Sequence, residues 1–114
     1  MVTINGIEWK IIICSSSNSK LRRSDNVYTL GVTDLNDKSI YLAVQLKGQL
    51  LYKVLCHELV HAACFSYGYF LDIKTEEIVA DFISLYGSKV IMAADTVFNN
   101  LVGGAGWKQS RNWI

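Results

Sequence analysis

The sequence of 114 residues contains no proline, only two histidines and three cysteines, and almost no net charge. An odd number of cysteines without a repeated spacing argues against a disulfide framework and indicates a reducing, cytoplasmic compartment. With a net charge of +1, the protein is not expected to attract nucleic acid or an anionic membrane electrostatically. No stretch is apolar over the length needed to cross a bilayer, and no basic region precedes Ile11–Ile13, so neither a membrane span nor a signal peptide is expected.

Both histidines lie in one short segment, His57-Glu58-Leu59-Val60-His61. Residues four apart on a helix share one face, with Cβ atoms about 5–6 Å apart. Two imidazoles with this spacing can both reach a metal at about 2.0–2.1 Å. Glu58 lies on the flank of the pair, where it can take a proton from a zinc-activated water without being a ligand. The pattern predicts a zinc site with its own general base. The alternative is a buried helix whose two histidines are hydrogen-bonded and bind no metal, since its sequence would show the same pattern.

A helix is predicted around this motif, from about Lys47 to about Tyr67, with Gly68 as its stop signal. No proline interrupts it, and its apolar residues recur at helical spacing: Leu50, Leu51, Val54, Leu55, Leu59, Val60, Ala63 and Phe65. Because it is apolar over most of its circumference, we expect it to be buried. Buried histidine and glutamate side chains need partners, which a metal would provide.

The third ligand cannot be histidine, because none remains. Cys64 lies on nearly the same helical face as His57 but about 10 Å away along the axis, so one zinc cannot easily bridge them. Cys64 and Cys56 are therefore expected to be small core residues. A carboxylate remains as the third ligand.

A second helix is predicted to begin near Asp72 or Thr75 and to continue to about Asn99. Glu77 and Asp81 lie on one polar stripe of this helix, opposite a broad apolar arc. Charged stripes usually face water. Next to a two-histidine motif, we expect instead that this stripe faces the metal.

In this interpretation Glu77 completes a site for one zinc ion per chain, and Asp81 accepts the free N–H of a ligating histidine. Glu76 points towards the apolar arc and is the weaker candidate, although a shift in helix register would exchange the two glutamates. Peptide hydrolysis also needs a donor for the developing negative charge. The candidates are Tyr67, Tyr69 and Tyr86.

The two motifs together resemble the glutamate-zincin pattern, as His57-Glu58-x-x-His61 followed by Glu77-x-x-Ala80-Asp81. The short spacing and small size are most similar to the ImmA/IrrE-type metallopeptidases, which are common on phages and bacterial mobile elements. The likeness covers about residues 28–90 and includes the strand region before the zinc helix.

This resemblance implies that His57, His61 and Glu77 bind Zn²⁺ and that Glu58 is the catalytic base. It also implies a setting in a bacterial or phage-infected cell. Typical members have asparagine at the position of Asp81, and they often carry a helix-turn-helix domain that is absent here. DNA binding and the repressor-cleavage role of the family are therefore not expected of this chain.

The first half of the chain is predicted to form strands, at Ile7–Cys14 and in a hairpin of Val27–Val32 with Ser39–Val44, connected by Asp34–Asp37. Lys20–Asn26 fits a loop or a short helical turn. The fold class is α+β, a minimal zincin-like fold in which a small twisted sheet packs on the zinc helix and the second helix. The strand just before the zinc helix is expected to lie beside the cleft, where an extended peptide can add to the sheet edge.

Residues 1–102 are expected to form one domain, followed by a glycine-rich break and a tail, residues 103–114. The two tryptophans of the tail are expected to pack back on the domain, with binding of a partner as the alternative. The leading hypothesis is a zinc metalloendopeptidase that cleaves a protein or peptide, with a regulator as a candidate substrate. One alternative is a zinc-stabilised binding or inhibitory protein that keeps the fold without catalysis. The other is a metal-dependent hydrolase of a non-peptide bond. Glu58 favours the enzymes, because a purely structural zinc has no use for a base.

Overall fold

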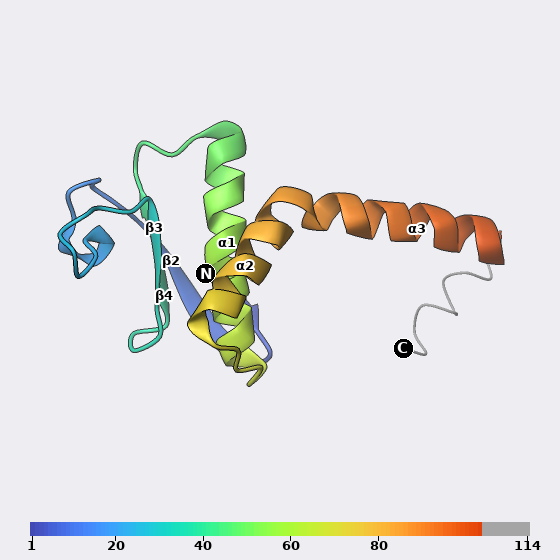
Figure 1. Cartoon of the computed structure of the whole chain (residues 1–114), viewed down its shortest axis with the longest axis horizontal. Helices are drawn as coiled ribbons and strands as arrows, with labels where there is room; N and C mark the ends of the chain where they lie inside the picture. Colours follow the sequence, from blue (N-terminus) through green and yellow to red (C-terminus); the bar gives the residue numbers. More distant parts are fainter. Residues whose placement is uncertain (104–114) are drawn as a thin grey trace.

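The computed structural model describes residues 1–103, and the tail at 104–114, with its expected packing, lies outside the described residues. The described chain is α+β, as predicted, with the strands first and the helices after them (Figure 1). The elements are β1 (Val2–Ile4), β2 (Ile7–Cys14), a 3-10 turn η1 (Ser19–Leu21), β3 (Gly31–Asp34), β4 (Ser39–Ala43), α1 (Gly48–Ser66), α2 (Ile73–Phe82), a π-helical turn η2 (Ile83–Gly87) and α3 (Ser88–Val102).

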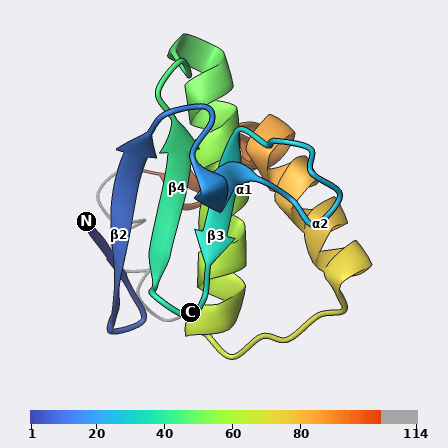
Figure 2. The same cartoon turned by 90° about the vertical axis from the view of Figure 1, so that its left-hand side faces the viewer.

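The four strands form one mixed sheet in the order β1-β2-β4-β3, which lies against α1 (Figure 2). β2 and β4 are parallel, whereas β1 pairs with β2 and β3 with β4 in antiparallel fashion. β1 and β2 are joined by a tight turn in which Asn5 and Gly6 both have positive φ, at 46° and 81°. Asn-Gly is the residue pair that such two-residue hairpin turns favour.

The position of the strand before α1 was predicted wrongly. β4 is an interior strand, with β2 on one side and β3 on the other, and all five of its residues are buried. The edge strand is β3. The parallel pairing of β2 with β4, with Ile12 opposite Tyr41, joins segments far apart in the sequence. Local alternation of residue types carries no signal for such a pairing.

The first strand of the expected hairpin was also placed too early, because regular pairing begins only at Gly31. The chain before it turns back on itself: Arg23 N–H donates to Val27 O, and Asn26, with φ of 66°, donates to Arg23 O. The segment that fitted either a loop or a helical turn contains both, because the short turn η1 precedes this loop. Asp34 ends β3 and closes the following turn by accepting from Asn36 N–H.

The core lies between the sheet and α1 and consists of Trp9, Leu21, Ile40, Tyr41, Leu42, Ala43, Leu46 and Ala62. Trp9 joins the two layers most directly. Its indole N–H donates to Ser66 Oγ at 2.8 Å, and its ring meets that of Phe65 edge-on, with centroids 6.1 Å apart. A buried tryptophan needs such a hydrogen-bond partner. These contacts set the C-terminal half of α1, which carries the histidines, against the sheet.

The helix that carries both histidines was predicted correctly to within a residue at each end, since α1 spans Gly48–Ser66. The second helix begins after Asp72, whose side chain caps it by accepting from Thr75 N–H at 3.0 Å. It then continues through the π-helical turn into α3, which extends away from the rest of the molecule (Figure 1). Among the described residues, no helix is long and apolar enough to cross a membrane.

Candidate metal centre

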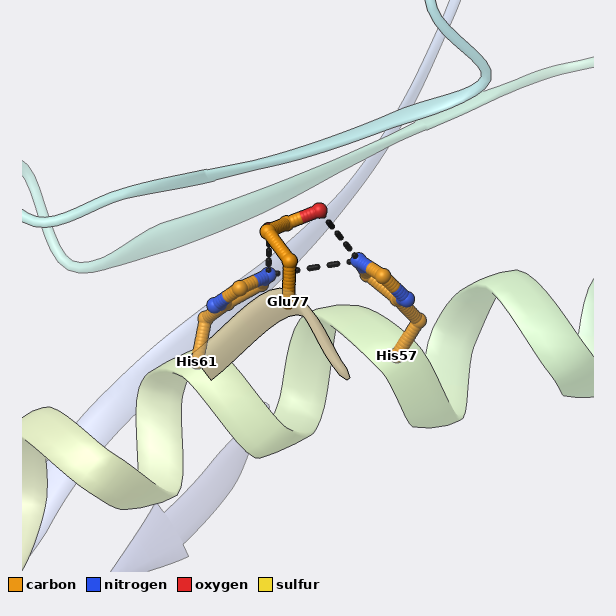
Figure 3. A group of neighbouring side chains, drawn as sticks. All are labelled: His57, His61 and Glu77. Atoms are coloured by element: carbon orange, nitrogen blue, oxygen red, sulfur yellow. Dashed lines mark hydrogen bonds and ion pairs between the residues drawn. The ribbon is translucent and has the colours of Figure 1, made fainter. Parts of the chain in front are cut away.

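The ring nitrogens of His57 and His61 face each other on α1, and the carboxylate of Glu77 reaches them from α2 (Figure 3). The two Nε2 atoms are 3.2 Å apart. Glu77 Oε1 lies 2.6 Å from His61 Nε2, and Glu77 Oε2 lies 3.5 Å from His57 Nε2. Among the described residues these three side chains form a group whose ligand atoms all lie within 4.8 Å of one another. Such a group could hold a metal ion.

The outer nitrogen of each histidine contacts a second carboxylate. Asp81 Oδ1 lies 2.9 Å from His57 Nδ1, the relationship expected from the sequence. Glu76 Oε1 lies 2.7 Å from His61 Nδ1, a contact that the sequence interpretation missed. Glu76 was placed on the apolar arc, yet its side chain is only 17% exposed and contacts the site. Glu76 and Glu77 therefore contact the two ring nitrogens of His61. This arrangement depends on where α2 crosses α1, which helical periodicity alone does not reveal.

These partners determine where the imidazole protons lie. A carboxylate only accepts, so each Nδ1 carries a proton and donates it to Asp81 or Glu76. In neutral rings both Nε2 atoms are then acceptors, and they face each other and the Glu77 carboxylate across a small space. Three converging acceptors repel one another unless extra protons on the rings or a cation lie between them.

The spacing fits a tetrahedral metal. Ligand atoms about 2.0–2.1 Å from a zinc ion are separated by about 3.3–3.4 Å along a tetrahedral edge. The separations from His57 Nε2 to His61 Nε2 and to Glu77 Oε2 are 3.2 and 3.5 Å. The shorter contact of Glu77 with His61 is of hydrogen-bond length. Because the Glu77 side chain is half exposed, it has room to adjust to a cation. Two imidazoles and a carboxylate suit zinc.

Glu58 lies beside this cluster but is not part of it. Its side chain is buried, and Thr33 of β3 holds it: Thr33 Oγ1 is 2.8 Å from Glu58 Oε1. The pKa of the Glu58 carboxyl is raised above its usual range, chiefly because the group is buried. The hydrogen bond from Thr33 and the nearby His57 and His61 act in the opposite direction and offset part of this effect. A carboxylate with a raised pKa is better suited to accept and return a proton.

Gly31 allows β3 to approach α1 closely at this point. A Cβ atom there would lie 2.7 Å from Val54 Cγ1 and 3.1 Å from Glu58 Cγ. Real Cβ atoms are essentially never found at the shorter distance. The absence of a side chain at Gly31 therefore brings the edge strand next to Glu58.

A cavity of about 540 Å³ opens over the cluster. It is lined by the three candidate ligands and Glu58, by β3, and by residues from the preceding loop and α2: Arg23, Thr29, Gly31, Val32, Thr33, Leu35, His57, Glu58, His61, Ile73, Glu76 and Glu77. A smaller cavity of about 350 Å³ adjoins it and is lined by Tyr28, Thr29, Leu30, Gly31, Lys53, Val54, His57 and Glu58. The two cavities share Thr29, Gly31, His57 and Glu58, so they meet at the start of β3 beside the cluster.

The structure places several other candidates away from this centre. Cys56 and Cys64 have free thiols and do not belong to the metal-binding group. Of the tyrosines considered as donors, Tyr67, Tyr69 and Tyr86 line neither cavity. Tyr28, which the sequence interpretation did not select, lines the smaller one.

Comparison of the chain with protein-family models, with curated proteins and with solved structures gave no significant match. The function is therefore inferred from the geometry of this chain.

Proposed function

We propose that the protein is a zinc-dependent metalloendopeptidase with a zincin-like fold. Its ligands would be His57, His61 and Glu77, with Asp81 and Glu76 orienting the two imidazoles. The observation that carries the proposal is the position of Glu58, a buried carboxylate that lines the same cavity as the ligands but stands outside their group. A purely structural metal site needs no such group, whereas a hydrolytic site needs a base.

Zinc, when bound, would supply the Lewis acidity that activates a water and polarises a substrate carbonyl. Glu58 would accept the proton of the attacking water and return it to the nitrogen of the leaving amine. Thr33 would keep the Glu58 carboxylate oriented throughout. Asp81 and Glu76 would hold the imidazoles with Nε2 facing inwards, because each accepts the proton of an Nδ1.

The edge strand β3 supports an extended peptide as the substrate. Gly31, Val32 and Thr33 line the main cavity, and β3 pairs with β4 on one side only. A peptide can add to such an edge through main-chain hydrogen bonds, with little demand on its side-chain identity. It would then run past Glu58 and the metal ligands.

A cleavage screen on a proteome-derived peptide library tests the proposal. The protein as purified, the protein stripped of metal by a chelator, and the stripped protein resupplied with zinc are each incubated with the library, and new termini are identified by mass spectrometry. We expect cleavage by the first and third samples and none by the second. Cleavage that survives complete removal of metal, or no cleavage by zinc-loaded protein, would contradict the proposal.

One observation favours the alternative of a zinc-stabilised binding protein. α3 has no buried residue, and its exposed apolar side chains include Val90, Ile91, Met92 and Leu101. Such a surface is typical of a protein that binds a partner. If the zinc-loaded protein cleaves no peptide, this second function takes precedence.

A further inference from the structure

Arg23 is the only lysine or arginine among the described residues that line the main cavity. It belongs to the loop between η1 and β3, which reaches past the edge of β3 on the side of α2 (Figure 2). The other charged groups of that lining are the carboxylates of Glu58, Glu76 and Glu77, besides the two histidines. A single cation therefore stands in a cavity that is otherwise acidic.

The backbone around Arg23 is well anchored for a loop. Arg23 N–H donates to Val27 O at 2.8 Å, and Arg23 O accepts from Asn26 N–H at 3.0 Å. On either side, Arg22 forms a bridge with Tyr28, and Thr29 N–H donates to the carbonyl of the fully buried Leu21 at 2.8 Å. The loop thus holds the Arg23 side chain at the wall of the cavity.

The guanidinium of Arg23 is not neutralised by a strong partner. Its ion pair with Asp25 is 3.8 Å long, and both side chains are more than half exposed, at 63% and 54%. Exposed pairs of this kind contribute little. The Arg23 side chain can therefore exchange Asp25 for a ligand at little cost.

We propose that Arg23 determines specificity by binding a carboxylate of the peptide substrate, either an acidic side chain or the C-terminal carboxylate. This inference rests on the proposed function in one respect, namely that the ligand is a peptide. Among the described residues that line the main cavity, Glu76 and Glu77 repel a carboxylate, and Arg23 is the only lysine or arginine that attracts one away from the metal ligands. Lys53 lines only the adjoining cavity. The planar guanidinium can also hold a carboxylate through two parallel hydrogen bonds.

The test uses peptides that the zinc-loaded protein cleaves, synthesised in sets that differ only by glutamate, glutamine or lysine at one position. Each is made with a free and with an amidated C terminus. Native protein is compared with Arg23→Gln, Arg23→Glu and Arg22→Gln. Arg22 is the matched control, because it is adjacent and exposed but lines neither cavity. Binding of the same peptides is measured by fluorescence anisotropy on Glu58→Gln protein with and without the Arg23 change.

We expect the native protein and Arg22→Gln to prefer one carboxylate-bearing form about tenfold or more in kcat/KM, which is the size of a charge-assisted hydrogen bond. Arg23→Gln should lose that preference through KM, and Arg23→Glu should favour peptides with lysine at the same position. The pair that responds, side chain or C terminus, identifies the source of the carboxylate.

Three results would overturn the inference while leaving the peptidase proposal intact. The first is that the native protein shows no preference for a carboxylate, and the second is that Arg23→Gln shows the same preference as the native protein. The third is that Arg23→Gln loses kcat equally for all peptides, which would indicate that Arg23 stabilises charge in the reaction itself. If the native protein cleaves nothing, the peptidase proposal fails. Glutamate and glutamine pairs of peptides from the screened library are then used for the binding measurements, which decide the role of Arg23 alone. Equal binding of acidic and neutral peptides in those measurements would then show that Arg23 does not bind a carboxylate of the peptide.

Discussion

Thr33 Oγ1 on the edge strand β3 lies 2.8 Å from Glu58 Oε1 and 2.9 Å from the main-chain oxygen of Glu58 on α1. A hydroxyl has one proton to donate, so Thr33 shares it between the side chain and the backbone of the same residue. This contact joins the strand that would receive a peptide to the group that would act as base. Because Gly31 lies two residues earlier on the same strand, the close approach of β3 and the orientation of Glu58 depend on each other.

The first prediction concerns this contact. Thr33→Val keeps the shape of the side chain but removes the hydroxyl, so Glu58 is no longer oriented. We expect kcat to fall about 10–100-fold, the range for a lost hydrogen bond to a charged group. Zinc content should be unchanged. Thr33→Ser, which retains the hydroxyl, is the control and should stay close to native. If Thr33→Val is as active as Thr33→Ser, the positioning role is wrong.

A second prediction is that purified protein binds one zinc per chain and that His61→Ala loses it. The His61 ring contacts His57, Glu76 and Glu77. Its removal therefore leaves only two of the three ligands and deprives Glu76 of its hydrogen-bond partner. Elemental analysis of both proteins measures this directly. Cys64→Ala is the matched control, because Cys64 is on the same helix but outside the metal-binding group. Unchanged metal content in His61→Ala would refute the ligand set.

The outer carboxylates give a third prediction. Asp81→Ala and Glu76→Ala should each weaken zinc binding roughly 10–100-fold, since each leaves an imidazole without the acceptor that fixes its orientation. Asp81→Asn and Glu76→Gln should have smaller effects, because an amide oxygen still accepts the Nδ1 proton. Competition with a zinc chelator gives the affinities, and circular dichroism checks that the fold is retained. Native affinity in both alanine variants would show that neither carboxylate orients a histidine.

Gly31 provides a fourth prediction, on stability. Gly31→Ala places a methyl group 2.7 Å from Val54 Cγ1, so β3 or α1 must move. We expect the free energy of unfolding to decrease by about 1–3 kcal/mol, as for overpacking in a core. In a Val54→Ala background the same change should cost less, because its nearest neighbour is gone. Denaturant unfolding of the four proteins measures the coupling. Strictly additive effects would mean that the two residues do not meet.

The helices could be predicted well because their signals are local. The apolar spacing around the histidines and the absence of proline located α1, and Asp72 is one of the two residues expected to cap the second helix. Strand β1 was missed although Asn5-Gly6 is a strong hairpin signal. The strand before this turn has only three residues, too few to show a clear alternation of residue types.

The arrangement of the elements was less accessible from the sequence. β4 lies inside the sheet because it pairs in parallel with β2, and this pairing leaves no trace in either strand alone. Helical periodicity brought Glu77 and Asp81 to the histidines but put Glu76 on the wrong side, because it says nothing of the angle at which α2 crosses α1. Arg23 lies in a Ser/Asn-rich loop, which the sequence alone does not connect to the cavity over the metal-binding group.

The zinc content and cleavage rate of Glu58→Gln together show whether Glu58 is the base of a three-ligand zinc site. The amide fills the same volume but cannot accept a proton, so kcat on a peptide that the native protein cleaves should fall about 10²–10⁴-fold. The same preparation should contain one zinc per chain, because Glu58 lies outside the metal-binding group. A zinc-loaded Glu58→Gln protein that cleaves at the native rate would show that Glu58 is not the base.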